Sequence, residues 1–238
     1  LPKGRKTQAD KVANLKHDPY QEFIDSPYVD PDPKSPTYLQ HLASAFKRGI
    51  AGAALDIPGS SKAQIGRLVW VNSERINIFG IPKMFMSVVR SADMNRTPDV
   101  RTRVIVPEWA AEISVSYMVP IMNAQSIANL LGAAGLTQGI GDWRPEKGKG
   151  TYGQYKFVDA NDADYKRIVK HGGRKAQQEA MDEPDFYDEE TEQLFRWFEG
   201  EVVNRGKKTA AATAADDHGK AKRNGKATGA EVPEVAEA

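Results

Sequence analysis

A glycine-rich segment that carries aromatic and basic residues between its glycines is the part of this sequence best suited to chemistry. It runs from Gly135 to Val158 and reads GLTQGIGDWRPEKGKGTYGQYKFV. Glycine lets a partner approach the backbone closely, Arg and Lys pair with phosphates, and aromatic rings stack on splayed bases. The segment therefore predicts a nucleic-acid contact made by Gly139, Gly141, Trp143, Arg144, Lys147, Lys149 and Tyr152.

A plainer interpretation of the same segment is a β-hairpin whose glycines serve turns alone. The segment follows an expected helix and precedes an expected strand, which is the reverse of the order in a dinucleotide fingerprint or a P-loop, so neither motif is present. In this interpretation Trp143 is packed, and Arg144 pairs with Asp142 or Glu146. The sequence alone leaves both interpretations open.

A second candidate is the basic stretch from Lys83 to Arg103, in which Asp93 and Asp99 are the only acids. We expect a loop between two strands, and a basic hairpin of this kind is suited to phosphate contacts. The alternative is an ordinary solvated loop. The candidate phosphate-contacting residues are Arg90, Arg96, Arg101 and Arg103.

The residue types that support catalysis or metal binding are scattered or missing. The sequence has no cysteine, and its four histidines, His17, His41, His171 and His218, show neither an H-x₃-H nor an HExxH spacing. We therefore expect no metal, no cofactor and no catalytic residue. The remaining enzymatic hypothesis is a nuclease with His41, on an expected helix, as general base.

Hydropathy patterns predict the elements that would position these residues. Ser35-Pro36 is typical of a helix start, and apolar residues follow it at helical spacing, with Gly49 and Gly52 allowing another element to approach closely. Alternating apolar runs then predict strands, Asn123 caps a helix from Ala124 to Ala134, and a last strand is expected over Tyr152 to Val158. This order predicts an α+β fold, a ferredoxin-like antiparallel sheet with its helices on one face.

Composition divides the chain of 238 residues into four zones. The net charge is +1, from 33 basic and 32 acidic side chains, and 40% of the residues are hydrophobic. We expect a polar arm over residues 1–34, an α+β core over 35–158, an acidic helical extension over 159–200 and a tail over 201–238. The tail carries basic residues and lacks aromatic ones, which predicts a disordered cationic segment. No stretch approaches the ~18 consecutive apolar residues of a membrane helix, so we expect no membrane partner.

The sequence also resembles a family of uncharacterised tailed-phage and prophage proteins with a G-x-G-x-W-R-P-E…G-x-x-G-x-F segment. The resemblance covers roughly Tyr38 to Val158, and the W-R-P-E segment is its specific part. Family members open with a further strand, so with Leu1 rather than Met at the first position we expect a lost or misread start. The matching residues are Pro107, Glu108, Trp109, Gly139, Gly141, Trp143, Arg144, Pro145, Glu146, Gly150 and Gly153, with Tyr155 at the position of the aromatic residue.

The order of helix, glycine-rich turn and strand is also similar to that of the RAMP superfamily of CRISPR proteins, which are ferredoxin-like RNA binders. This likeness rests on layout, and it implies nucleic-acid binding without catalysis. The expectation is a cytoplasmic, phage-encoded protein that binds single-stranded DNA or RNA, or a nucleoprotein, in replication, recombination or a nucleoprotein complex. The alternative is a virion or assembly protein that forms homo-oligomers.

Overall fold

The computed structural model describes residues 18–90, 98–148 and 150–204. These residues divide into two compact units. The smaller unit takes in residues 18–22, the ends of the strands β5 (Lys83–Arg90) and β6 (Pro98–Ile105), and residues 188–204. The larger unit takes in residues 23–85 and 102–187, and it contains the W-R-P-E segment over residues 143–146.

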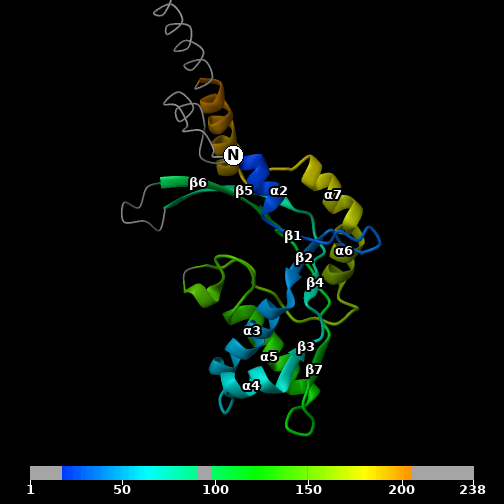
Figure 1. Ribbon diagram of the computed structural model, residues 1–238. Coiled ribbons are helices and arrows are strands. Elements are labelled where there is room, and N and C mark those ends of the chain that lie inside the picture. The colour runs from blue at the N-terminus through cyan, green and yellow to red at the C-terminus, as the bar shows by residue number, and fades with distance from the viewer. Residues whose placement is uncertain (1–17, 91–97, 149, 205–238) are drawn as a thin grey trace, which may run out of the picture. The chain divides into compact units, whose positions relative to one another are not determined.

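The described strands form three small sheets (Figure 1). Strand β2 (Leu39–Leu42) lies between β1 (Tyr28–Val29) and β4 (Arg75–Asn77), β3 (Val69–Val71) pairs with β7 (Val115–Tyr117), and β5 pairs with β6. All the registers in the first two sheets are antiparallel. The α+β class is therefore shown, whereas the single ferredoxin-like sheet is not confirmed.

The first core helix begins later than the sequence predicts. Leu39 to Leu42, expected to be helical, form strand β2, and helix α3 (Ala43–Ala53) follows it, extended by a short 3-10 helix, η1 (Ala54–Asp56). The strand forms because the Tyr38 and Leu39 amides both donate to the side chain of Gln177, far away in the sequence. These long-range hydrogen bonds outweigh the local helix-start signal at Ser35-Pro36. The prediction of a helix that begins there was wrong.

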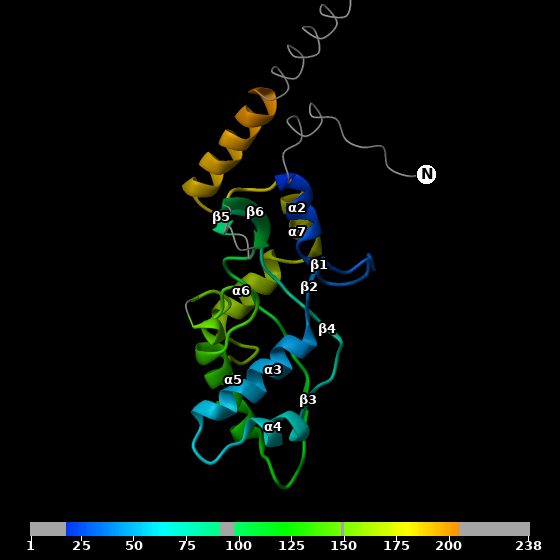
Figure 2. The same ribbon diagram turned by 60° about the vertical axis from the view of Figure 1, so that its left-hand side comes forward.

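Three helices form the main packing group of the larger unit. Helix α3 packs on α4 (Lys62–Leu68) and on α5 (Ala124–Thr137), and it lies beside α5 in both views (Figures 1 and 2). Asn123 caps α5 as predicted, because its Oδ1 accepts a hydrogen bond of 2.9 Å from the Ser126 amide. The buried apolar residues at the centre of this group are Ile50, Ala54, Ile65, Val69, Ile127, Leu130 and Leu131.

The glycines of α3 allow a close approach, as the sequence predicts. A Cβ on Gly52 would overlap the side chain of Gln138, which follows the end of α5, and Gly49 faces the Gln138 Cβ. The absence of side chains on these two residues therefore brings the end of α5 against α3. The glycine-rich segment starts from this contact.

Helices α6 (Ala163–His171) and α7 (Arg174–Asp182) belong to the larger unit, although they follow the zone expected to be the core. The side chain of Gln177 on α7 is fully buried. Its Oε1 accepts from the Tyr38 amide at 2.7 Å and the Leu39 amide at 3.0 Å. Its Nε2 lies 2.7 Å from the Ile78 carbonyl oxygen and 3.0 Å from those of Gly80 and Gly172.

The smaller unit contains part of α2 (Pro19–Asp25) and a helix over residues 189–204. That helix begins at Asp188, whose Oδ1 accepts a 2.8 Å hydrogen bond from the Thr191 amide. Thr191 is buried, and its hydroxyl accepts from the Met86 amide at 3.3 Å, which fixes the helix against β5. The polar arm before residue 18 and the tail after residue 204 lie outside the described residues.

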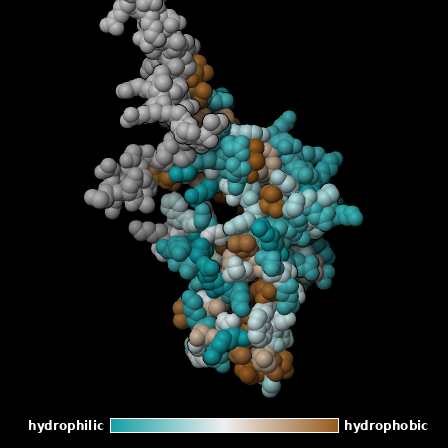
Figure 3. All heavy atoms as spheres, in the orientation of Figure 1, coloured by the Kyte–Doolittle hydropathy of each residue, from teal (hydrophilic) through white to brown (hydrophobic). Residues whose placement is uncertain are grey.

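The loop after β7 presents apolar side chains to solvent. Met118, Val119 and Ile121 are exposed, and Figure 3 shows a group of hydrophobic atoms where this loop projects beyond α4.

None of the described helices is both long and apolar enough to cross a membrane.

The buried amide of Gln177 leads to the first testable prediction. Replacing it by leucine would leave two amide donors and three carbonyl acceptors without this partner. Unsatisfied buried groups cost about 1–3 kcal/mol each, so we expect Gln177→Leu to lower the free energy of unfolding by ~3 kcal/mol or more in urea denaturation. Gln178→Leu, at the exposed neighbouring position, is the control; equal denaturation midpoints for the two variants would contradict this role.

Candidate nucleic-acid interface

Close contacts between glycines and carbonyl groups fold the segment from Gln138 to Gly153 back on itself. A Cβ on Gly135 would overlap the Tyr155 carbonyl, one on Gly150 would overlap the Trp143 carbonyl, and one on Gly153 would overlap the Ile140 carbonyl. Backbone hydrogen bonds reinforce two of these contacts: Ile140 to Gly153 at 3.0 Å and Tyr155 to Gly135 at 3.1 Å. The glycines therefore serve turns, as the plainer interpretation holds, but the described residues of the segment form no β-hairpin, so that part was wrong. We call residues 138–153 the glycine turn.

The side chain of Trp143 is largely exposed, although the glycine turn is otherwise compact. Its φ of 53° lies in the left-handed region, and it is the only described non-glycine residue with a positive φ. Its carbonyl accepts from the Tyr152 amide at 3.2 Å and lies against Gly150. The backbone is thus held in an unfavourable conformation, while 59% of the residue remains exposed. The expectation that Trp143 packs inside the protein, part of the plainer interpretation, is therefore wrong.

Arg144 forms its hydrogen bonds within the glycine turn. Its Nη1 donates to the Gly141 carbonyl at 2.8 Å and its Nε donates to Glu146 at 2.9 Å. The guanidinium also holds the pKa of Glu146 below its ordinary value, chiefly by this hydrogen bond. Arg144 therefore pairs with Glu146, as the plainer interpretation predicts. It thereby links the Gly141 carbonyl to the short 3-10 helix η2 (Pro145–Lys147), which lies within the glycine turn.

A pocket of about 260 Å³ lies between α3 and the glycine turn. Arg48 lines it from α3, and Gln138 to Asp142 line it with Arg144 from the turn. The four consecutive amides of residues 141–144 donate no hydrogen bond to any residue that the structure describes. Free amides of successive residues, together with a guanidinium, are the groups that bind phosphate oxygens.

The positive charges around this pocket differ in what they already contact. The side chains of Arg48 and Lys147 form no hydrogen bond or ion pair within the described ranges, and both residues are exposed. Arg103 reaches the turn from β6 and pairs with Asp142. This contact joins the two regions that the sequence singled out, and it neutralises one of the two carboxylates of the turn.

His41 lies at the pocket edge between two aromatic rings. The rings of Tyr28 and Phe46 each approach it edge-on at 6.2 Å. Burial lowers the pKa of His41, an effect opposed by its hydrogen bond to the Leu42 carbonyl. The imidazole packs as an aromatic side chain between these two rings, and its role as a nuclease base stays a prediction.

The remaining predicted residues are dispersed. Tyr152 is partly exposed, and its ring meets Phe85 edge-on at 6.2 Å. Arg101 pairs with Glu22 at 3.2 Å in the smaller unit, so it is not among the residues that the turn assembles. Arg96, Lys149 and the side chain of Arg90 lie outside the described residues.

Sequence reasoning missed Arg48 and the row of free amides at residues 141–144. A signal for Arg48 was present, because it directly precedes Gly49, and small residues on α3 mark the face that another element approaches. The row of amides could not be found in this way, since it depends on the backbone angles of Gly141 and Trp143, which only the folded loop reveals.

No group of three or more His, Asp or Glu side chains within residues 18–90, 98–148 and 150–204 is placed to hold a metal ion. Comparison with protein-family models, with curated proteins and with solved structures found no match for this chain.

The fit between Gly150 and Trp143 gives the second testable prediction. A methyl group at Gly150 would force the Trp143 carbonyl to move, so we expect Gly150→Ala to cost about 1–3 kcal/mol of stability and to change the fluorescence maximum of Trp143, read in a chain whose other tryptophans are replaced by phenylalanine. Gly132→Ala is the control, because a Cβ there meets open space. An unchanged Trp143 spectrum in Gly150→Ala would show that this glycine does not hold the tryptophan.

Proposed function

We propose that this protein binds single-stranded nucleic acid, DNA or RNA, without catalysing a reaction on it. The contact surface consists of the glycine turn together with Arg48 on α3. Trp143 offers a stacking face, and Arg48, Lys147 and the free amides at residues 141–144 bind phosphates. A stacked base contributes ~1–3 kcal/mol.

The observation that carries the proposal is the exposed ring of Trp143 on a constrained backbone. A tryptophan usually buries most of its surface, yet here several close contacts of the turn keep its backbone left-handed and its side chain largely exposed. Strained conformations persist where the surroundings enforce them, and they cluster at functional sites. An aromatic platform beside cationic side chains is the combination that single-strand binding proteins use.

Of the two roles that the sequence left open for Arg144, we propose the structural one rather than a direct phosphate contact. Because it already bonds to Gly141 and Glu146, its contribution to binding is to keep the turn folded, with part of its charge directed to the pocket. We further propose that the setting is a nucleoprotein complex of a phage or prophage. This part of the proposal is supported by the resemblance of the W-R-P-E segment to the phage-protein family.

Binding of a fluorescein-labelled 20-mer, measured by anisotropy at two salt concentrations, tests this function. We expect Trp143→Ala to weaken binding about 5- to 150-fold, which corresponds to ~1–3 kcal/mol of stacking. We expect the Arg48→Ala, Lys147→Ala double variant to reduce the salt slope by about 0.7 for each lost phosphate contact. Arg144 is left intact, because its removal would unfold the turn.

Trp197→Ala is the matched control. Trp197 is 52% exposed, which is similar to the exposure of Trp143, but it lies on the helix over 189–204. A chain ending at Asn204 separates the folded part from the basic tail. Equal affinities of Trp143→Ala and wild type would exclude the turn as the binding surface. Binding that disappears with the tail would show non-specific attraction alone.

A second function, homo-oligomeric assembly, is favoured by the apolar loop after β7. Val119 and Ile121 are among its exposed side chains, and exposed apolar patches mark interaction surfaces. If this loop joins copies of the chain, size-exclusion chromatography should show an oligomer that Val119→Ser with Ile121→Ser converts to monomer. Leu55→Ser, at an exposed leucine elsewhere, should leave it intact. A wild-type chain that elutes as a monomer would reject assembly through this loop.

A further inference from the structure

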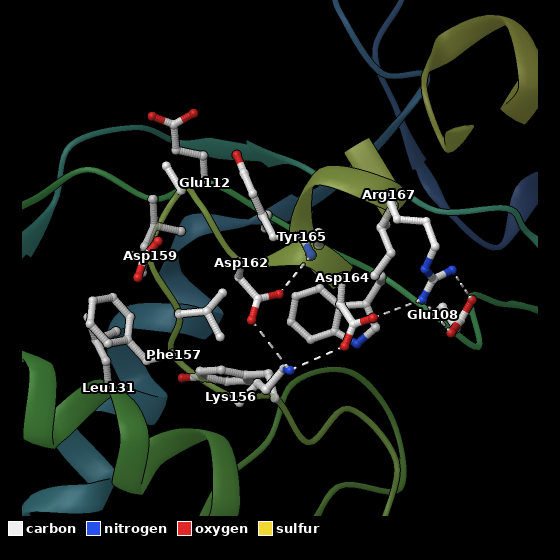
Figure 4. Close-up of a pocket in the computed structure, with 18 of the residues that line it drawn as sticks. Glu108, Glu112, Leu131, Lys156, Phe157, Asp159, Asp162, Asp164, Tyr165 and Arg167 are labelled. Carbon is white, nitrogen blue, oxygen red and sulfur yellow. Dashed lines mark hydrogen bonds and ion pairs between the residues drawn. The ribbon is translucent and has the colours of Figure 1, made fainter. Parts of the chain in front are cut away.

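A second and larger cavity lies on the larger unit, outside the nucleic-acid surface proposed above. It has a volume of about 550 Å³ and opens between residues 107–113, residues 154–160 and helix α6 (Figure 4). Phe46, Leu131 and Ile113 contribute apolar lining, and Trp109 meets Tyr155 edge-on at 5.8 Å. Burial raises the pKa of Tyr155 to about 12. We call this cavity the groove.

Two segments without regular secondary structure, residues 111–113 and 156–158, border the groove. The sequence predicted a strand over Tyr152 to Val158, but the structure has none there, and that prediction was wrong. No backbone N–H or C=O group of residues 111–113 or 156–158 forms a hydrogen bond with any part of the chain that the structure describes. Backbone polar groups in folded proteins are almost always paired, and unpaired extended segments are templates for an added strand.

On one side of the groove the charged side chains pair with one another, and on the other side they have no cationic partner among the described residues. On one side Arg167 forms two hydrogen bonds with Glu108, at 2.9 and 3.0 Å, and Lys156 lies 3.3 Å from Asp164. On the other side Glu112 and Asp159 have no cationic partner among the described residues, and Figure 4 shows both of them away from Arg167. The lining therefore keeps an excess of negative charge beside an apolar floor.

We propose that the groove binds an extended basic segment of a partner protein by strand addition. The peptide backbone pairs with residues 111–113 and 156–158. Because alternate side chains of a strand point to opposite faces, one set of side chains enters the apolar floor, while Lys or Arg side chains of the other set reach Glu112 and Asp159. This mode of recognition takes its affinity from main-chain hydrogen bonds and its specificity from the side-chain pockets.

The choice of a basic peptide follows from complementarity. An acidic peptide would meet Glu112 and Asp159 without compensation, and a nucleic-acid strand would bring phosphates to the same carboxylates. The groove and the nucleic-acid surface therefore select partners of opposite charge.

The test measures binding of a fluorescein-labelled ten-residue peptide of alternating Val and Lys to the full-length chain, without nucleic acid. We expect saturable binding that Glu112→Gln with Asp159→Asn weakens at least tenfold. The matched control is Asp56→Asn with Glu74→Gln, which makes the same change of net charge at exposed positions outside the groove and should alter the affinity less than twofold.

Two variants of the peptide complete the test. The same peptide with N-methyl groups on its valine amides should bind at least tenfold more weakly, because it cannot donate those hydrogen bonds, and the peptide with Glu in place of Lys should not bind. Equal affinities of the N-methylated and unmodified peptides, or of the Glu112 and Asp159 variant and wild type, would overturn the proposal. Trp143→Ala should bind the peptide like wild type, so failure here and failure of the nucleic-acid function are distinguishable.

Discussion

The larger unit depends on one buried side-chain amide, that of Gln177. It satisfies two amides at the start of β2 and three carbonyls at residues 78, 80 and 172, so it joins α7, β2, the end of β4 and the end of α6. The backbone groups that it binds belong to segments without a continuous sheet to pair them. The same amide holds the end of α6 through the Gly172 carbonyl, and α6 contributes Tyr165, Arg167 and Ile168 to the groove wall.

A second constraint, the close approach of glycines to carbonyl groups, shapes the proposed nucleic-acid surface. The turn needs no phosphate to explain Gly150 or Gly153, since each fits against a carbonyl of the turn itself. The consequence for function is indirect: this tight folding is what holds Trp143 in an exposed, left-handed conformation and leaves the amides of residues 141–144 unpaired. The tight turn and the proposed binding surface thus depend on the same glycines.

Local signals predicted some elements well, and distant contacts account for the rest. The helix after Asn123 and the close approach at Gly49 and Gly52 follow from capping and from side-chain size, both readable over a few residues. The helix start at Ser35 failed because Gln177, far along the chain, pairs the amides of Tyr38 and Leu39. Composition located the glycine turn, but it left two roles open for Arg144, and only the folded loop shows that this side chain bonds to Gly141 and Glu146. Composition also missed Arg48, which comes from another helix.

The central claim is that nucleic acid lies on Trp143, and photochemical cross-linking tests it most directly. A 20-mer that carries 5-iodouracil reacts on irradiation with an aromatic side chain on which the base stacks, and the modified peptide is then identified by mass spectrometry. This account predicts modification at Trp143, with weaker modification of Tyr152. Modification confined to residues 205–238, or to Trp197, would contradict it.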